Sequence, residues 1–332
     1  IIEKSTNTLI VGCKSTTISD SVTCIDNYAF EGCRDLTNIA IPDSIKRIND
    51  YAFLDCIGLT SISIPNSVTY IGREVLSGCS DLTIINVNDN NTVYDSRNNC
   101  NAIIEKSTNT LIVGCKNTTI PDSVTRIGNE AFRGCTGLTS IIIPDNVTYI
   151  GHYAFYGCSK LNSVCIIPEN TVINKYAFSE TDYKIQILAP KDSSVYNTLK
   201  RDCNVIPYSF TVNKDDKDKP MLALDGKVVL AEDMWSCICR LVKDTDVQYI
   251  YFKEFDFGDM MPEYVIEDYD KDEFNYKDLV LSVIKDGDTI RLGMVDEKQS
   301  FFELVEALVE QFVFKVANII SAALRYIFKR WG

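Results

Sequence analysis

The stretch that decides the fold runs from Ser123 to Leu161 and reads SVTRIGNEAFRGCTGLTSIIIPDNVTYIGHYAFYGCSKL. It spells one pattern twice, with Phe132 and Phe155 placed 23 residues apart. The same step continues on both sides, through the Ile-Pro pairs at 41–42, 64–65, 120–121 and 143–144 and through Phe30, Phe53, Leu76 and Phe178. Self-similarity at a fixed period of this length predicts a solenoid of stacked repeats, because one such unit cannot bury its own apolar face.

The period is broken once. Leu76 and Phe132 are 56 residues apart, so one unit has 33 residues in place of 23. This longer unit ends in two apolar runs, Ala102–Ile104 and Leu111–Val113, around a Ser-Thr-Asn-Thr turn, which predicts a hairpin. Fourteen residues of the hairpin unit, IIEKSTNTLIVGCK, also open the chain. We therefore expect residue 1 to fall inside an earlier copy of the same unit.

Each repeat carries the letters of one short strand and one tight turn. In LTSISIP, Ile62 and Ile64 alternate with serines, which is the period of a strand buried on one face. Pro65 ends the strand because it has no N–H to donate. An Ala-Phe pair is expected to begin a single helical turn that points the Phe ring and the Cys three residues later into the core. We expect five parallel strands in one sheet, at Leu36–Ile41, Leu59–Ile64, Leu82–Val87, Leu138–Ile143 and Leu161–Ile166.

The thirteen cysteines follow the repeat rather than the spacing of a disulfide framework. Since thirteen is odd, at least one thiol is free. We expect no metal site and no cofactor, because the chain has no CxxC pair and only one histidine, His152, at a variable repeat position that we expect to be exposed. The repeat positions are predicted to hold buried, reduced thiols: Cys33, Cys56, Cys79, Cys135 and Cys158, together with Cys13 and Cys115 of the hairpin units.

The pattern of Ser123–Leu161 resembles the BspA-type leucine-rich repeats, also called the Treponema-type class, in its period and in its Pro, Ala-Phe, Cys and strand positions. The resemblance covers residues 1–208, and Ile187–Tyr208 is similar to the cap of that family, with a strand, a proline, a short helix and a closing strand. The chain departs from the pattern at Val75-Leu76, where Ala-Phe is usual. The resemblance implies an α/β leucine-rich-repeat solenoid with parallel strands, in a bacterial cell-surface or secreted protein that serves adhesion or host interaction without enzymatic activity.

The composition changes after residue 208. Residues 209–219 are predicted to be a charged linker, since NKDDKDK (213–219) is followed by a proline, and residues 220–332 are predicted to form a small acidic α+β domain. We expect hairpins at the Asp-Gly pairs 225–226 and 286–287, a strand over VQYIYFKEF and a short helix over EDMWSCICRLVKD.

An acidic run, Glu254–Glu273, lies in this domain. Asp268, Asp270 and Asp272 have the spacing of an EF-hand loop, but Glu273 and Leu279 stand where that loop needs Gly and a bidentate Glu. We therefore expect a solvated acidic loop. Calcium binding and a carboxylate pair for glycoside hydrolysis are the alternatives.

Residues 301–330 are predicted to form a long amphipathic helix. Its longest uncharged run, Val316–Leu324, is shorter than the ~20 residues that a bilayer span needs. We expect its apolar stripe to pack on the small domain or on a second copy of the chain. An interfacial helix is the alternative, since Tyr326, Phe328 and Trp331 lie beside Lys329 and Arg330. The stripe includes Leu304, Leu308, Phe312, Ile319, Ala323 and Ile327.

The net charge and the lack of catalytic motifs argue against two classes of function, nucleic-acid binding and catalysis. The net charge of −13 argues against nucleic acid as a partner, because its binding relies on clustered Lys and Arg. The sequence has no Gly-rich phosphate loop, no GxSxG and no HExxH, so we expect no enzyme.

The residues that face outward from the predicted strands form the candidate protein-binding surface, which we call the sheet strip. Most of them are small and polar, with apolar positions at Ile84 and Ile142, and such solenoid surfaces suit extended protein partners. The strip consists of Asn38, Ala40, Ser61, Ser63, Ile84, Asn86, Ser140, Ile142, Ser163 and Cys165.

We therefore expect a non-enzymatic protein-binding or adhesion module of a bacterial surface or secreted protein, with a host surface or matrix protein as the partner. One alternative is that the repeats act only as a spacer. The other is an effector-like protein whose C-terminal helix engages a membrane or a partner, with the repeats as a targeting or spacer module. Self-association through that helix is a further expectation.

Overall fold

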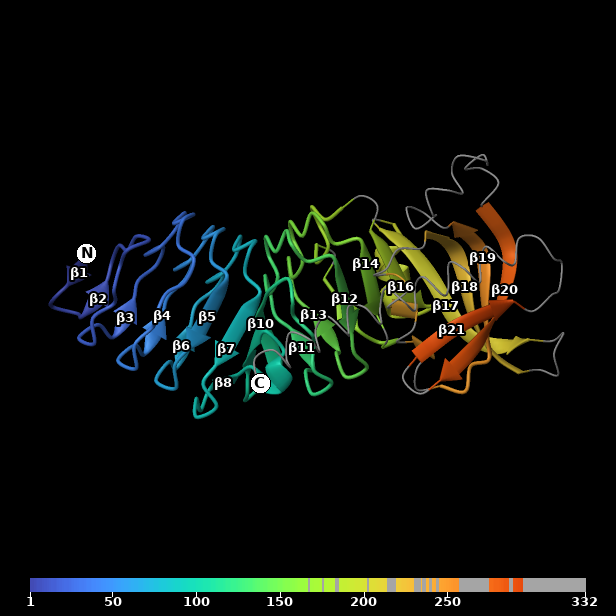
Figure 1. Ribbon diagram of the computed structural model, residues 1–332, viewed down its shortest axis with the longest axis horizontal. Helices are drawn as coiled ribbons and strands as arrows, with labels where there is room; N and C mark the ends of the chain where they lie inside the picture. Colours follow the sequence, from blue (N-terminus) through green and yellow to red (C-terminus); the bar gives the residue numbers. More distant parts are fainter. Residues whose placement is uncertain are drawn as a thin grey trace, which may run out of the picture. The chain divides into compact units, whose positions relative to one another are not determined.

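The computed structural model describes residues 1–256, 275–286 and 289–294, apart from residues 167, 175, 183–184, 202, 214–218, 230–233, 235–236, 239–240 and 243–244. The chain divides into two compact units, Ile1–Val205 and Ile206–Gly332. The first unit contains the 23-residue repeats, which follow one another from blue to green in Figure 1.

Two rows of parallel strands run through the first unit. The long row has four- or five-residue strands: β5 (Ser61–Ile64), β7 (Ile84–Val87), β12 (Ser140–Ile143), β14 (Ser163–Ile166) and β16 (Gln186–Pro190). The short row has two-residue strands: β3 (Cys24–Ile25), β4 (Arg47–Ile48), β6 (Tyr70–Ile71), β11 (Arg126–Ile127), β13 (Tyr149–Ile150) and β15 (Val172–Ile173).

The long row is not the single five-stranded sheet that the sequence predicts. β5 and β7 form a two-stranded sheet, while β12, β14 and β16 pair with one another further along the chain. Residues 36–41 form no strand, although Thr60 N–H donates to the Thr37 carbonyl at 3.0 Å and so joins this segment to the next repeat. The prediction of one sheet is wrong because the 33-residue unit interrupts the row between β7 and β12.

The short row forms sheets that the sequence analysis did not anticipate. β3, β4 and β6 pair in parallel, as do β11, β13 and β15. Because each pair keeps the 23-residue register, equivalent side chains of neighbouring repeats lie side by side. Arg47 lies over the ring of Tyr70 with its Cζ 3.9 Å from the centroid, and Arg126 lies over Tyr149 at 4.2 Å.

The predicted hairpin of the longer unit is confirmed. β9 (Ala102–Glu105) and β10 (Thr110–Gly114) pair antiparallel, β8 (Tyr94–Asp95) joins the other edge of β9, and a short 3-10 segment, Arg97–Asn99, lies between β8 and β9. The first copy of the unit repeats the arrangement with β1 (Ile2–Glu3) and β2 (Thr8–Leu9).

The hairpin separates two hydrophobic cores. Since side chains alternate along a strand, its residues divide between them. Ala102, Ile104 and Leu111 belong to the core of the later repeats. Ile103, Val113 and Cys115 belong to the core of the earlier repeats.

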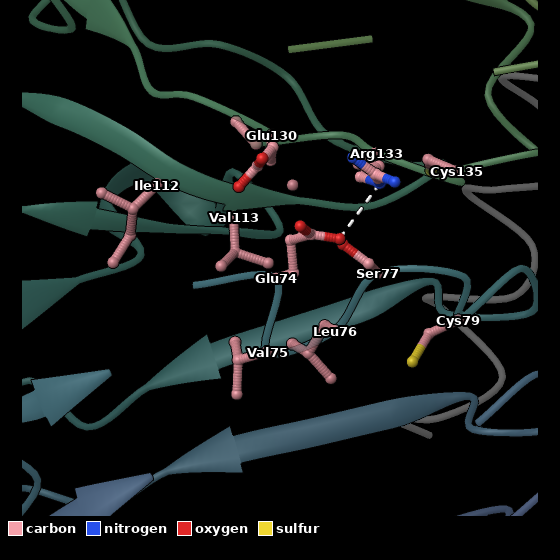
Figure 2. Close-up of a pocket in the computed structure, with 12 residues that line it drawn as sticks. Glu74, Val75, Leu76, Ser77, Cys79, Ile112, Val113, Glu130, Arg133 and Cys135 are labelled. Carbon is pink, nitrogen blue, oxygen red and sulfur yellow. Dashed lines mark ion pairs between the residues drawn. The ribbon is translucent and has the colours of Figure 1, made fainter. Parts of the chain in front are cut away.

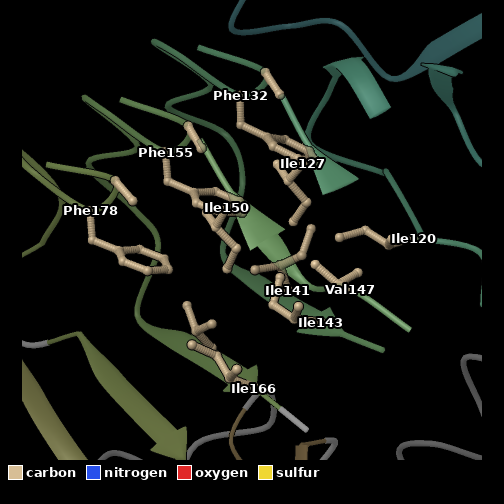
Figure 3. Close-up of a cluster of buried hydrophobic side chains, with 14 of the residues drawn as sticks. Ile120, Ile127, Phe132, Ile141, Ile143, Val147, Ile150, Phe155, Ile166 and Phe178 are labelled. Carbon is tan, nitrogen blue, oxygen red and sulfur yellow. The ribbon is translucent and has the colours of Figure 1, made fainter. Parts of the chain in front are cut away.

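Phenylalanine rings of successive repeats stack inside each core. The ring centroids of Phe30 and Phe53 are 5.0 Å apart, those of Phe132 and Phe155 are 4.9 Å apart, and those of Phe155 and Phe178 are 5.0 Å apart. Figure 3 shows the second stack beside the isoleucines of the strands. Leu76 occupies the equivalent position between the two stacks.

The Ala-Phe segments are turns and not the predicted helical turns. The residue before four of the five Ala-Phe pairs takes a left-handed backbone, which an α-helix does not contain; φ is 59° at Tyr28, 60° at Tyr51, 60° at Glu130 and 53° at Tyr153. The Phe rings are nevertheless buried in the core. The backbone of these turns is held to the next repeat, as where Phe30 N–H donates to the Ala52 carbonyl at 2.7 Å.

The cysteine prediction is confirmed at most positions. Cys56, Cys79, Cys135 and Cys158 are buried, Cys33 is partly buried, and every cysteine in the described ranges is free. The thiols also satisfy backbone groups of the preceding repeat. The Sγ of Cys56 donates to the Phe30 carbonyl at 3.1 Å, and the Sγ of Cys158 to the Phe132 carbonyl at 3.1 Å.

Cys13 and Cys115 occupy equivalent positions but differ in exposure. Cys115 is buried, as predicted, whereas Cys13 is exposed. The structure therefore confirms the buried thiol at Cys115 and contradicts it at Cys13.

The end of the first unit follows the predicted cap. β16 is followed by the helix α1 (Ser194–Leu199) and by β17 (Asn204–Asn213). Ser193 caps the helix, since its side chain accepts a hydrogen bond from the Tyr196 N–H at 3.0 Å.

The second unit is built on a mixed sheet. β17 pairs antiparallel with β18 (Lys219–Val229), β18 parallel with β19 (Tyr249–Asp256), and β19 antiparallel with β20 (Asn275–Asp286). The parallel pair requires a crossover, and the described residues of the intervening segment, Met234, Cys237, Ile238, Leu241 and Val242, are helical and buried. The predicted strand and short helix therefore agree with the structure.

Two predictions for this region need correction. The predicted linker 209–219 lies partly in strands, because β17 extends to Asn213 and β18 begins at Lys219. Asp225-Gly226 lies inside β18, where the register to β19 shifts between Leu224 and Lys227; a bulge takes the place of the predicted hairpin turn. The hairpin predicted at Asp286 is present, with β21 (Thr289–Met294) pairing back on β20.

Most of the acidic run, with Asp268, Asp270 and Asp272, and the predicted helix 301–330 lie outside the described residues. Within the described ranges, no helix has the length and hydropathy that a bilayer crossing requires.

Candidate binding surface

The structure exposes the earlier half of the sheet strip. Asn38, Ala40, Ser63, Ile84 and Asn86 are exposed, and Ser61, Ser140 and Ile142 are half-buried. The register of β5 and β7 places Ser61 beside Ile84 and Ser63 beside Asn86. Ile84 is 53% exposed, so an aliphatic side chain stands among small polar neighbours.

The last two positions of the strip are not on the surface. Ser163 is 1% exposed and Cys165 is 0% exposed, so the prediction that they face outward is wrong. β14 is buried on both faces, and so is β16. The sequence carried a signal for this, because Val164, Cys165 and Ile166 form a continuous apolar run, which is typical of a strand covered on both sides.

A second surface, which the sequence analysis missed, follows the residue before each Ala-Phe pair. We call it the tyrosine–glutamate column; it consists of Tyr28, Tyr51, Glu74, Glu130, Tyr153 and Tyr176. The rings of Tyr28 and Tyr51 stack at 4.8 Å, and those of Tyr153 and Tyr176 at 5.7 Å. The sequence did carry a signal for this surface: the position two residues before each repeat's Phe, or before Leu76, is always Tyr or Glu.

The two halves of the column meet at the seam left by the longer unit. The Nε of Arg133 lies 3.0 Å from a carboxylate oxygen of Glu74, and Gly78 N–H donates to the Arg133 carbonyl at 3.3 Å. Figure 2 shows this ion pair, with Glu130 and Val113 beside Glu74 on the side away from Arg133, around a crevice between the two repeats. The Glu74 side chain is only 8% exposed, against 35% for Arg133.

The seam holds more negative than positive charge. Burial raises the pKa of the Glu74 carboxyl, and the neighbouring Glu130 raises it further, while Arg133 opposes the change. The Glu74 carboxylate in turn raises the pKa of the Tyr51 hydroxyl. Arg133 also contacts the other half of the column, with its Cζ 4.9 Å from the ring centroid of Tyr156 and 5.8 Å from that of Tyr153.

His152 packs beside the column and is half-buried, which corrects the expectation that it is exposed. Its Nδ1 lies 2.9 Å from the Asn174 Oδ1, and its ring centroid is 3.9 Å from that of Tyr153. The neighbouring aromatic rings cover it. Within the described ranges, no group of three or more His, Cys, Asp or Glu side chains has the arrangement of a metal site.

Stacked 23-residue repeats with parallel strands, and with a buried Phe and a Cys in most of them, define a leucine-rich-repeat solenoid. A family model for the BspA type leucine rich repeat region, with six copies, matches residues 7–111 and 102–205. The chain belongs to this family. The comparison with curated proteins returns no match.

Several solved structures are similar to part of the chain. A leucine rich cell surface protein from Faecalibacterium prausnitzii A2-165 is 28% identical over 58% of this chain and 59% of that one, with a TM-score of 0.42. A leucine-rich repeat protein from Eubacterium ventriosum is 18% identical over 52% and 65%, with a TM-score of 0.33. The pneumococcal vaccine antigen PcpA is 17% identical over 57% and 66%, with a TM-score of 0.30. The chain thus spans 59% of the first of these proteins.

Proposed function

We propose that the repeats form a non-enzymatic protein-binding module and that the partner contacts the exposed part of the sheet strip. The observation that carries the proposal is Ile84, 53% exposed on β7 and in register with Ser61 of β5. An exposed aliphatic side chain can anchor a partner, and the amide and hydroxyl groups of Asn38, Ser63 and Asn86 around it can pair with an extended backbone. Ser163 and Cys165 have no part in this contact.

We further propose that the module belongs to a bacterial surface or secreted protein and serves adhesion to a host surface or matrix protein. Membership of the repeat family supports a binding role, since solenoids of this kind present long surfaces to extended partners. The effector-like alternative depends on residues 301–332, and no described residue favours it.

The test is the binding of the purified chain to immobilised extracellular-matrix proteins, measured by biolayer interferometry. Ile84→Lys should weaken binding to the recognised protein at least about tenfold, as expected for an anchor residue. Val172→Lys is the matched control, because Val172 is also an exposed aliphatic strand residue, at 61%, but lies on the short row. Equal effects of the two changes would contradict the sheet strip, and a lack of binding to any matrix protein would contradict adhesion to the matrix.

A further inference from the structure

The Tyr28–Tyr51 end of the tyrosine–glutamate column is a rigid aromatic surface. The two rings are nearly parallel, 6° apart, and Tyr28 is 48% exposed. Both residues hold left-handed backbones, fixed by hydrogen bonds to the next repeat from Tyr28 N–H to the Asp50 carbonyl at 3.2 Å and from Tyr51 N–H to the Arg73 carbonyl at 2.9 Å. Little conformational entropy remains to be lost when a partner binds these rings.

The centre of the column is negatively charged. Glu74 and Glu130 are adjacent, and among the described cations Arg133 alone forms an ion pair with Glu74. Arg73, the other nearby cation, pairs with Asp50 at 3.6 Å. Two carboxylates against one guanidinium leave an excess of negative charge beside the ring of Tyr51.

Arg133 shows which ligand chemistry this column accepts. Its guanidinium lies between the Glu74 carboxylate and the rings of Tyr153 and Tyr156, so it combines an ion pair with contacts to aromatic faces. Tyr28 and Tyr51 offer the same combination on the other side of Glu74. In the part of the chain that the structure describes, no cation lies over these two rings.

We propose that the Tyr28–Tyr51 pair, together with Glu74, binds an arginine or lysine side chain from an extended basic segment of a partner protein. Aromatic faces attract cations, and the carboxylates at the seam add charge complementarity. The stacked rings of successive repeats suit an extended chain, whose side chains follow one another along the column. The proposal rests on the protein-binding function but uses a surface separate from the sheet strip.

The probe is a fluorescein-labelled ten-residue peptide of alternating Arg and Gly, and binding is measured by fluorescence anisotropy. Tyr28→Asn with Tyr51→Asn removes both rings, and Asn tolerates the left-handed backbone, so the fold is retained and is checked by thermal melting. Because no charge changes, general attraction to the acidic chain is the same in wild type and variant. We expect about tenfold weaker binding in this double variant, about threefold for each ring.

Three control variants separate the outcomes. Tyr28→Phe with Tyr51→Phe keeps the rings and should retain binding, and Tyr70→Asn removes an exposed tyrosine from the short row without effect. Ile84→Lys should also leave peptide binding unchanged, so that failure of the sheet strip and failure of this site can be told apart. No binding to the wild-type chain, or equal binding by wild type and the Asn double variant, would overturn the proposal.

Discussion

The guanidinium of Arg133 lies 3.0 Å from the carboxylate of Glu74, although the longer repeat separates the two residues in the sequence. The pair joins the last repeat of the first core to the first complete repeat of the second, at the point where Leu76 interrupts the phenylalanine stack. With the bond from Gly78 N–H to the Arg133 carbonyl at 3.3 Å, it keeps the repeats in contact across the seam. The seam is therefore held by a charged pair where the other repeats use stacked rings.

Replacing Arg133 with Gln should destabilise the repeat unit. The change leaves the buried Glu74 carboxylate beside Glu130 without its cation, and an uncompensated buried charge costs about 2 kcal/mol or more. Glu74→Gln should lower the unfolding free energy by less, because it removes the buried negative charge itself and leaves Arg133 able to reach solvent. Denaturant unfolding of both variants measures the difference, and a larger loss for Glu74→Gln than for Arg133→Gln would contradict this account.

The pH dependence of stability should reveal the raised pKa of the Glu74 carboxyl. Burial and Glu130 raise the pKa of its carboxyl in the folded state, so the protonated form is favoured by folding. This contribution to stability is fully present below the unfolded pKa of about 4.3 and is lost as the pH rises through the folded value. Glu74→Gln mimics the protonated form at every pH. Its unfolding free energy relative to wild type should therefore increase from pH 4 to pH 8, whereas a constant difference would exclude the shift.

Much of the repeat unit could be predicted from the sequence, because the signals are local. The period, the hairpin, the cap and the buried thiols each follow from residue types at fixed spacing, and the structure contains them except that Cys13 is exposed and Cys33 only partly buried. The single sheet failed because pairing between β7 and β12 depends on where the longer unit places β9, which no local pattern encodes. The prediction that Cys165 faces outward was wrong for a related reason. Alternation along a strand assigns side chains to the two faces of the sheet, but it does not tell whether the second face is covered.

The tyrosine–glutamate column shows a different limit of the sequence. Tyr28, Tyr51 and Tyr153 occupy equivalent positions before Ala-Phe pairs, so the stacking of the repeats places them in one column. Each has a left-handed backbone, which replaces the helical turn that the sequence predicts. Because such a backbone is uncommon for Tyr and Glu, residue preferences gave no indication of it.

Thiol labelling should distinguish Cys13 from the buried cysteines. Hydrogen bonds from the side chains of Ser15 and Thr16 lower the pKa of Cys13 to about 7, and the residue is exposed, so it should react fastest in the native protein. Burial raises the pKa of Cys56 to about 12, so Cys56 should react only after unfolding. Iodoacetamide labelling followed by peptide mapping provides the measurement.

The rate at Cys13 should rise as the pH passes through about 7, because the thiolate is the reactive form. Cys13→Ser should remove the fast phase and leave the labelling in denaturant otherwise complete. Rapid native labelling of Cys56 would contradict the buried thiol positions.

Gly114→Ala should destabilise the hairpin unit. A Cβ at Gly114 would overlap the ring of Phe132, and Gly12 stands in the same relation to Phe30 in the first copy of the fourteen-residue repeat. Gly114 N–H also donates to the Ala131 carbonyl at 2.8 Å, so the backbone cannot easily move away from the ring. Overpacking of this kind costs about 1–3 kcal/mol. In a double-mutant cycle by denaturant unfolding, Phe132→Leu should recover part of the loss, because the smaller side chain makes room for the methyl group. Additive costs in the double variant would show that the ring is not what requires glycine at this position.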